Sequence, residues 1–389
     1  MKFLSVFRKT LLEMSRDRWM LGLTLAFAPF FVLLYWLITA GGSTTYKILV
    51  INQDTGVQLS DGSTFNAGRE AFNALFGITY GDGQPLLKSI LVDGQAEAER
   101  IVRDRGAVAF LLFPPNFSQT IQALKNGDRS VTTRVIFGGD LSNPYYMVGV
   151  NLALTAVDSY VQQASNQRPL VQYLELPLGA SAARTEFETY VPGTLIFAVI
   201  MLIFLASMTV VREIETGTLH RLQLSPMTSF DLLGGITAAL VLVGTVAYAL
   251  AFICALLVGF RSQGPVWIAL LIGVVTSLSV IGLGMVVASF SHTVSQAFVV
   301  SNFPLGLMMF FSGVIYPLPK VTLFSLAGHE IGLYDFLPPT HAVAALNKVL
   351  TLGADLNGVL FELAALIILS ALYFAMGVWF FRRFHLRNG

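Results

Sequence analysis

The stretch "DLLGGITAALVLVGTVAYALAFICALLVGF", residues 231–260, holds no charged side chain after Asp231. A helix that crosses about 30 Å of hydrocarbon, rising about 1.5 Å per residue, needs roughly 20 mainly apolar residues. This stretch exceeds that length. It therefore predicts a transmembrane helix, and it indicates that the fold is built in a membrane.

Five more stretches satisfy the same criterion of length and low polarity: residues 19–40, 191–211, 266–290, 297–316 and 359–381. Charged residues make up only 12% of the chain, whereas a soluble domain has about 25%. The first stretch is longer than the roughly 7–15 apolar residues of a signal peptide, so we interpret it as a retained anchor. The sequence predicts an α-helical polytopic membrane protein with six transmembrane helices.

Basic residues near the ends of these stretches predict the orientation, because cytoplasmic loops are enriched in Lys and Arg. With six spans, both termini and the loop between the second and third spans share one side. That side holds most of the basic residues near the membrane: Lys2, Arg8, Lys9, Arg16, Arg18, Arg212, Arg221, Arg382, Arg383 and Arg387. The short loops opposite hold Arg261, Lys320 and Lys348. We expect both termini in the cytoplasm and the protein in the plasma or inner membrane.

The segment between the first two spans, residues 41–189, has the composition of a soluble domain and is long enough for one fold. Short β-branched or apolar runs predict strands at 46–51, 107–113 and 132–137. The runs between and after them predict helices: "GQAEAERIVRDRG", "NFSQTIQALKNGD" and "NPYYMVGVNLALTAVDSYVQQ". Alternating strands and helices predict an α/β domain, which the orientation places outside the cytoplasm.

Several kinds of chemistry have no support in the sequence. A net charge of +1 gives no basic field for nucleic acid. No Lys follows a Gly, so the phosphate-binding loop G-x-x-x-x-G-K-[ST] is missing. The span interiors lack the ionisable residues of an ion-coupled carrier, since Asp231 and Glu362 stand at span edges. The spacing of His329, Glu330, Asp335 and His341 does not match a metal-binding helix. We expect no catalytic, cofactor-binding or metal-binding residue in this chain.

The loop between the second and third spans, "VREIETGTLHRLQLSPMTSF" at 211–230, is charged at one end and contains a proline near the other. We expect Glu213 and Glu215 to project into the cytoplasm, Gly217 to loosen the helix and Pro226 to end the segment. Leu219 and Leu222 lie one helical turn apart, as in an element that docks into a groove of a partner. A solvated loop is the alternative. Thr228 and Asp231 predict a capping box that begins the third span.

The residues of this loop resemble those of a known family. "REIETGTLHRLQLSPMTSFDLLGG" resembles the E-R-E-x-G-T-x-E-x-L-x-x-x-P loop of type-2 permeases of ATP-binding-cassette (ABC) transporters. His220 and Ser225 depart from that pattern, where an acidic residue and a threonine are frequent. "MKFLSVFRKTLLEMSRDRWM" is similar to the family's amphipathic N-terminal helix with its Arg-Asp motif. Its apolar face would hold Phe3, Phe7, Leu11 and Met14.

Three more segments are similar to the same family. "AVAFLLFPPNFSQTIQALKNGDRSVTTRVIFGGDLSN" resembles the outer domain of its drug-exporting branch, and "FFSGVIYPLP" and "LPPTHAVAALNKVLTLGADL" resemble its segments around the end of the fifth span and before the sixth. The resemblance divides the chain into a cytoplasmic N-terminal helix (1–18), the first span (19–40), an extracytoplasmic α/β domain (41–189) and spans two to six (190–389). The last part includes a coupling loop (212–229) and an outer re-entrant segment (317–340), with short helices expected within 317–337.

The resemblance implies a permease that pairs with a second permease, identical or related, and with ATPase subunits that hold ATP and Mg. Contact with the ATPase would involve the end of the N-terminal helix, at Arg16, Asp17 and Arg18. It would also involve these coupling-loop residues: Arg212, Glu213, Glu215, Gly217, Thr218, Leu219, Leu222 and Pro226. A periplasmic adaptor and membrane lipid are further expected partners.

Two features of the spans have roles in either interpretation. Pro304 and Gly306 in the fifth span predict a helix bend, either for the transport cycle or as an ordinary packed kink. Gly282 and Gly284 in the fourth span predict close helix packing.

We expect the chain to be the permease subunit of an ATP-driven exporter for an amphipathic, drug-like or lipid-like substrate. The alternative is a membrane-anchored receptor or assembly scaffold with a ligand-binding outer domain, and a sodium-coupled carrier is a distant third.

Overall fold

The computed structural model describes residues 2–39, 45–59, 62–80, 83–128, 130–141, 143–165, 185–217, 227–315, 321–326 and 329–386. The chain divides into two compact units. One unit, a helical bundle, comprises Met1–Ile38 and Pro177–Gly389, and the other, the inserted domain, comprises Thr39–Leu176.

The bundle confirms the six predicted spans. Within the described residues, six stretches of helix are long and apolar enough to cross a membrane. They are formed by α2 (Arg18–Thr39), α7 and α8 (Glu186–Ile200 and Leu202–Glu215), α10 (Ser229–Leu257), α11 (Val266–Ser289), α12 (Val294–Phe311) and α14 (Leu360–Phe381). The second span is thus built from two helices that meet at Met201. Shorter helices accompany them: α1 (Lys2–Arg16), α13 (Pro338–Leu350) and a π-helix (Arg382–Leu386).

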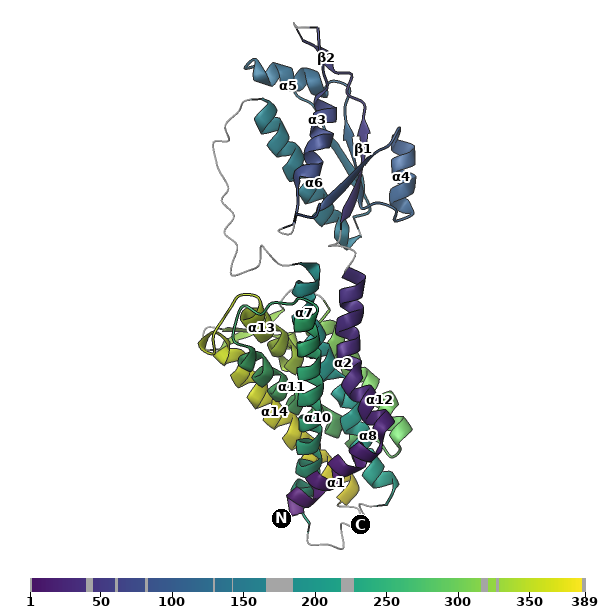
Figure 1. Ribbon diagram of the computed structural model, residues 1–389, viewed down its shortest axis with the longest axis vertical. Coiled ribbons are helices and arrows are strands. Elements are labelled where there is room, and N and C mark those ends of the chain that lie inside the picture. Colours follow the sequence, from purple (N-terminus) through teal and green to yellow (C-terminus); the bar gives the residue numbers. More distant parts are fainter. Residues whose placement is uncertain are drawn as a thin grey trace. The chain divides into compact units, whose positions relative to one another are not determined.

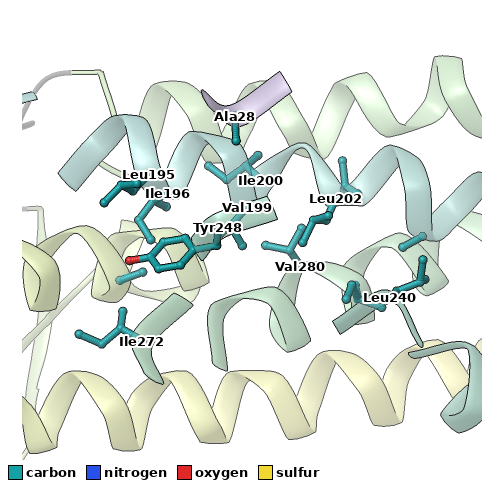
Figure 2. Packing of buried hydrophobic residues seen from close by; sticks show 14 of the residues in the cluster. Ala28, Leu195, Ile196, Val199, Ile200, Leu202, Leu240, Tyr248, Ile272 and Val280 are labelled. Carbon is teal, nitrogen blue, oxygen red and sulfur yellow. The ribbon is translucent and has the colours of Figure 1, made fainter. Parts of the chain in front are cut away.

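The helix α11 lies at the centre of the bundle, where it packs against α14, α8, α10, α13 and α7. Tyr248 of α10 is 1% exposed, and its hydroxyl donates a hydrogen bond to the Ala269 carbonyl of α11 at 3.0 Å. Its ring lies against Gly273, where an added Cβ would come within 2.7 Å of it. Figure 2 shows Tyr248 surrounded by apolar side chains, with Ile196 of α7 and Ile272 of α11 nearby.

The two most exposed spans are α2 and α12. Only 11% of the apolar window of α2 and 22% of that of α12 are buried, against 61% for α11. Their remaining apolar surface faces outward, where lipid or another membrane chain would cover it. One polar contact still ties α12 inward: the hydroxyls of Ser207 on α8 and Ser301 on α12 lie 2.8 Å apart.

The inserted domain is an α/β sandwich, as predicted. Its sheet has the order β4-β1-β5-β6, with the first three strands parallel and the last antiparallel. Its strands are β1 (Tyr46–Asn52), β4 (Leu87–Leu91), β5 (Ala109–Phe113) and β6 (Ile136–Gly139), and its helices are α3 (Ala67–Ala74), α4 (Gln95–Arg103), α5 (Phe117–Lys125) and α6 (Pro144–Ala164). A two-stranded hairpin, β2 (Val57–Gln58) and β3 (Thr64–Phe65), precedes α3.

Side chains of β1 alternate between two cores. Ile48 and Val50 pack with α3, α5 and α6, while Leu49 and Ile51 pack with α4. Figure 1 shows α4 on one face of the sheet and α3 with α6 on the other. A strand that is buried on both faces has a continuous run of apolar residues in its sequence, which explains why the strand at 46–51 was predictable. The third predicted strand, 132–137, begins only at Ile136, and the prediction missed β4 and α3.

A carboxylate holds three elements of this domain together. Asp54 follows β1 and is 8% exposed. Its Oδ1 accepts a hydrogen bond from the Ser118 backbone N–H at 3.0 Å, and its Oδ2 accepts one from Gly68 N–H at 3.0 Å. The Ser118 hydroxyl donates to the same Oδ2. Because Gly68 and Ser118 lie in the first turns of α3 and α5, Asp54 fixes both helix starts to the sheet.

We predict that residues 41–189 expressed alone unfold in one cooperative transition. Asp54→Asn should lower the free energy of unfolding by about 2–3 kcal/mol, because an amide NH₂ replaces an acceptor that faces N–H donors. Thermal and urea unfolding followed by circular dichroism measure both effects. Asp128→Asn is the control, since this carboxylate is fully exposed. An unfolded spectrum would contradict the domain boundary, and equal effects of the two variants would contradict the role of Asp54.

We predict that the inserted domain loses stability at alkaline pH because of Tyr160. Burial raises its pKa, and so do the hydrogen bond from its hydroxyl to Glu70 Oε2 at 3.0 Å and the negative charges of Glu70 and Asp54. The folded state therefore favours the neutral phenol, a stabilisation fully present below about pH 10 and lost as the pH rises above it. Urea unfolding between pH 8 and about 11 should show a smaller loss in Tyr160→Phe than in the wild type. The exposed control Tyr145→Phe should follow the wild type.

The segment before the last span corrects one expectation. The short helices expected within 317–337 are wrong for two stretches, which form the antiparallel strands β7 (Thr322–Leu326) and β8 (His329–Gly332). The β-branched residues Val321 and Thr322 and the aromatic Phe324 in "VTLFSL" favour a strand over a helix. A 3₁₀ helix (Leu333–Phe336) follows, and α13 begins at Pro338. Residues 316–320 and 327–328 lie outside the described part.

Candidate functional site

The candidate site is a junction at the end of the bundle where α1 crosses (Figure 1). The helix α1 packs against α10 at two consecutive glycines, Gly234 and Gly235. A Cβ on Gly235 would come within 2.7 Å of the Val6 Cβ, and a Cβ on Gly234 would come within 3.2 Å of the Phe3 ring. The absence of side chains at this pair therefore allows the two helices to approach closely.

The buried face of α1 differs from the predicted one. Val6, Thr10 and Met14 are buried, whereas Phe3 is 38% exposed. Of the predicted face, Met14 is buried and Leu11 is partly buried against the bundle core, whereas Phe7 is half-buried and Phe3 is exposed. Contact with the glycine pair of α10 determines which face of α1 is buried. The spacing of apolar residues within α1 alone gives no information about that contact.

The Arg-Asp motif marks the boundary between α1 and the first span. The first helix ends at Arg16 and α2 begins at Arg18. Asp17 lies between them, and its Oδ1 accepts a hydrogen bond from the Met20 backbone N–H at 3.1 Å. Both arginines are exposed. The motif thus caps the first turn of α2 and leaves two cationic side chains available to a partner.

An ion pair connects α1 to the end of the second span. Lys9 Nζ lies 2.7 Å from Glu213 Oε1 and 2.8 Å from Oε2. Glu213 is 7% exposed, and Glu13 on α1 lies 3.6 Å from the same ammonium group. The expectation that Glu213 projects into the cytoplasm is therefore wrong. Its carboxylate is turned back against α1, because a buried carboxylate requires a partner.

Glu215 connects the same end of α8 to a third helix. Its Oε2 accepts a hydrogen bond from the Val294 backbone N–H at 3.0 Å, at the first residue of α12. A carboxylate at a helix N-terminus is favoured by the unpaired N–H groups and the helix dipole. Glu215 is exposed, as expected, and its carboxylate also caps the fifth span, so the end of α8 is bound to both α1 and α12.

The described part of the coupling loop ends soon after this point. Arg212 is exposed, and Gly217 has a φ of +69°, a conformation that ends α8 and suits glycine. On the far side of the loop, the predicted capping box is confirmed: Thr228 Oγ1 accepts from Asp231 N–H, and the Asp231 side chain accepts from Thr228 N–H. Four predicted contact residues lie outside the described residues: Thr218, Leu219, Leu222 and Pro226.

Two other predicted positions lie away from this junction. The helix α12 continues through Pro304 without interruption from Val294 to Phe311. An added Cβ on Gly306 would meet no described atom within 4 Å, so this glycine serves no close approach in this unit. Among the described residues, no group of three His, Cys, Asp or Glu side chains could hold a metal ion.

Two apolar cavities lie along the second span and were missed by the sequence. One, of about 360 Å³, lies between α2, α7, α8, α10 and α12 and includes Met201, where the second span is interrupted. The next, of about 280 Å³, lies further along α2 and α7. Phe27, which lines the first, and Phe31 and Phe197, which line the second, are in mutual contact, with ring centroids 4.7–6.3 Å apart. The spacing of Phe27 and Phe31 on one helical face is the only signal in the sequence.

We predict that Lys9→Met loosens α1 from the bundle. Removal of the ammonium group leaves the Glu213 carboxylate buried without its partner, which should cost about 1–2 kcal/mol of local stability after allowance for the exposure of Lys9. Hydrogen exchange of α1 amides in the purified protein should accelerate roughly tenfold, which is the rate change that 1.4 kcal/mol produces.

Two variants complete this test. Glu13→Gln is the control, since this side chain is 55% exposed and its oxygen lies 3.6 Å from Lys9. Gly235→Leu should have a larger effect than Lys9→Met, because its side chain would occupy the position of Val6. Unchanged exchange in both Lys9→Met and Gly235→Leu would contradict the packing of α1 described above.

Comparison with known protein families supplies a further finding. A family model described as ABC-2 family transporter protein matches residues 18–379, nearly the whole chain. A search of curated proteins gives no match.

Proposed function

The chain belongs to the ABC-2 transporter family, and from this membership we propose that it is the permease subunit of an ATP-driven exporter. The family is a membrane component of transporters and implies a separate ATPase subunit. In this proposal the partner ATPase binds ATP and Mg, and this chain converts the movement of the ATPase into movement of its spans.

The observation that carries the proposal is the junction of α1, α8 and α12. Lys9 and Glu213 join the first two helices, and Glu215 joins α8 to α12. A force applied to α1 or to the end of α8 therefore acts on two spans at once. Such a rigid connection between a terminal helix and the spans is what a transmission element requires.

The basic residues indicate which side this junction faces. Arg16, Arg18 and Arg212 are exposed around it, and Lys and Arg are enriched on the cytoplasmic side of membrane proteins. We infer that the junction faces the cytoplasm, where an ATPase has access to ATP, and that the inserted domain lies on the opposite side of the membrane.

The apolar cavities along α7 and α8 support an amphipathic, drug-like or lipid-like substrate. Their lining is almost entirely aliphatic, aromatic or methionine side chains. Methionine and phenylalanine adapt to apolar molecules of varied shape. Because α2 and α12 are the least buried spans, their outer surfaces are the proposed contact with a second permease and with lipid.

We predict that the tagged chain, purified gently from its native membrane, carries an ATPase subunit in a near one-to-one ratio by quantitative mass spectrometry. Arg212→Glu should reduce that ratio about tenfold, because it reverses an exposed charge at the junction and, within the described part of the chain, removes no hydrogen bond or ion pair of that side chain. Arg100→Glu, at an exposed position on α4, is the matched control. Absence of any ATPase from a folded preparation would favour a receptor or scaffold.

A further inference from the structure

A third cavity, of about 480 Å³, lies at the end of the bundle opposite the junction. It is enclosed by the start of α7, the end of α12, the 3₁₀ helix and α13. Its lining has more polar groups than that of the two cavities along the second span, and it alone of the three includes a charged residue, Asp335. The polar lining residues include Tyr190, Ser312, Tyr334, Asp335, Thr340 and Asn347. It is therefore suited to a ligand that is not purely apolar.

One wall of this cavity offers aromatic faces. The rings of Phe311 and Tyr334 are stacked, with centroids 5.4 Å apart and planes inclined by 22°. Tyr190 on α7 also lines the cavity and is 37% exposed. Aromatic faces carry a negative electrostatic potential, so they attract flat apolar groups and cations but not anions.

The charge of the described lining is negative. Asp335 supplies a half-buried carboxylate whose Oδ2 accepts a hydrogen bond from the Gly332 N–H at 2.7 Å. The described lining residues include no Lys, Arg or His. Of the basic side chains on α13, His341 places its Nε2 2.8 Å from the Asp335 backbone carbonyl, and Lys348 lies 2.6 Å from Glu362 and is thereby neutralised. An anion in this cavity would be repelled by Asp335, and a cation would be attracted.

The cavity also holds polar groups that the fold does not use. Within the described part of the chain, neither the Asn347 side-chain amide nor the Tyr334 hydroxyl makes a hydrogen bond. A small metal ion would require several oxygen ligands converging on one point, and the described residues contain no such group of acidic or histidine side chains. A larger organic ion could contact the carboxylate, the amide and the aromatic faces together.

We propose that this cavity binds an amphipathic organic cation, with Asp335 facing its positive charge and Phe311 and Tyr334 facing its aromatic or aliphatic part. This inference rests on the proposed function, since it gives the chemical class of the exported molecule at the exit end of the path. The two apolar cavities accept the apolar part of such a molecule. The third cavity, which we call the Asp335 cavity, distinguishes cations from anions.

The test uses the full chain in nanodiscs, without ATPase and without nucleotide, and measures fluorescence anisotropy of rhodamine 123. Fluorescein, an anion with the same ring system, is the matched ligand, and empty nanodiscs correct for partition into lipid. Rhodamine 123 should bind saturably and fluorescein should not. Asp335→Asn should weaken the binding of rhodamine 123 about tenfold, while it keeps the oxygen that accepts from Gly332.

Two further variants make the outcome decisive. Ala344→Trp should abolish binding, because Ala344 is exposed into the cavity on α13 and the indole would fill it. Glu330→Gln on β8 removes the same charge outside the cavity lining and should leave the affinity unchanged. Equal binding of fluorescein, or unchanged affinity in Asp335→Asn and Ala344→Trp, would overturn the proposal. Because no ATPase is present, failure of ATPase association would leave this readout intact and would count against the proposed function alone.

Discussion

Close approach of helix backbones at glycine is the constraint on which the bundle depends. Helices in a bilayer gain little from burial of apolar surface, because lipid is as apolar as their side chains, so they associate through close packing. On α11, a Cβ at Gly282 would come within 2.8 Å of the backbone of α14, and one at Gly284 would come within 2.6 Å of Ala206 on α8. These contacts confirm the packing role predicted for both glycines. They make α11 the support against which α8 and α14 are positioned.

Close packing leaves few places for charge, and the chain uses those places at the ends of its spans. Glu213 is buried, but Lys9 lies against it, and Glu215 caps α12. At the opposite end, the carboxylate of Glu362 lies against Lys348. Each of these carboxylates therefore connects elements that apolar packing alone would leave free to slide. Partial burial makes such pairs effective in fixing position, whatever their net contribution to stability.

Hydrophobic length and local turn chemistry made the spans, the α/β insert and the Thr228 capping box predictable, because each of these signals lies within one short segment. The junction was not predictable in the same way. Lys9 and Glu213 are 204 positions apart, and nothing in either segment indicates that they meet. The buried face of α1 depends on Gly235 of another helix, and the strands β7 and β8 are stabilised by a pairing that a family resemblance does not reveal. Local signals thus identified the residues around the site, and tertiary contacts decided what those residues touch.

The second span connects the junction to the Asp335 cavity, and its interruption at Met201 divides that connection into two parts. Near Met201 the chain makes a tighter turn, with Phe204 N–H bonded to the Met201 carbonyl. Below this turn, α8 is held to α12 by Ser207 and Ser301 and to α1 through Glu213. Above it, α7 approaches the segment that follows α12, at Gly193, where a Cβ would clash with the Val314 carbonyl. The two halves are therefore held by different contacts. A displacement of α8 at the junction is carried to α12 through the contact of Ser207 with Ser301, and along the second span it reaches α7 through the turn at Met201, which lies beside the first apolar cavity.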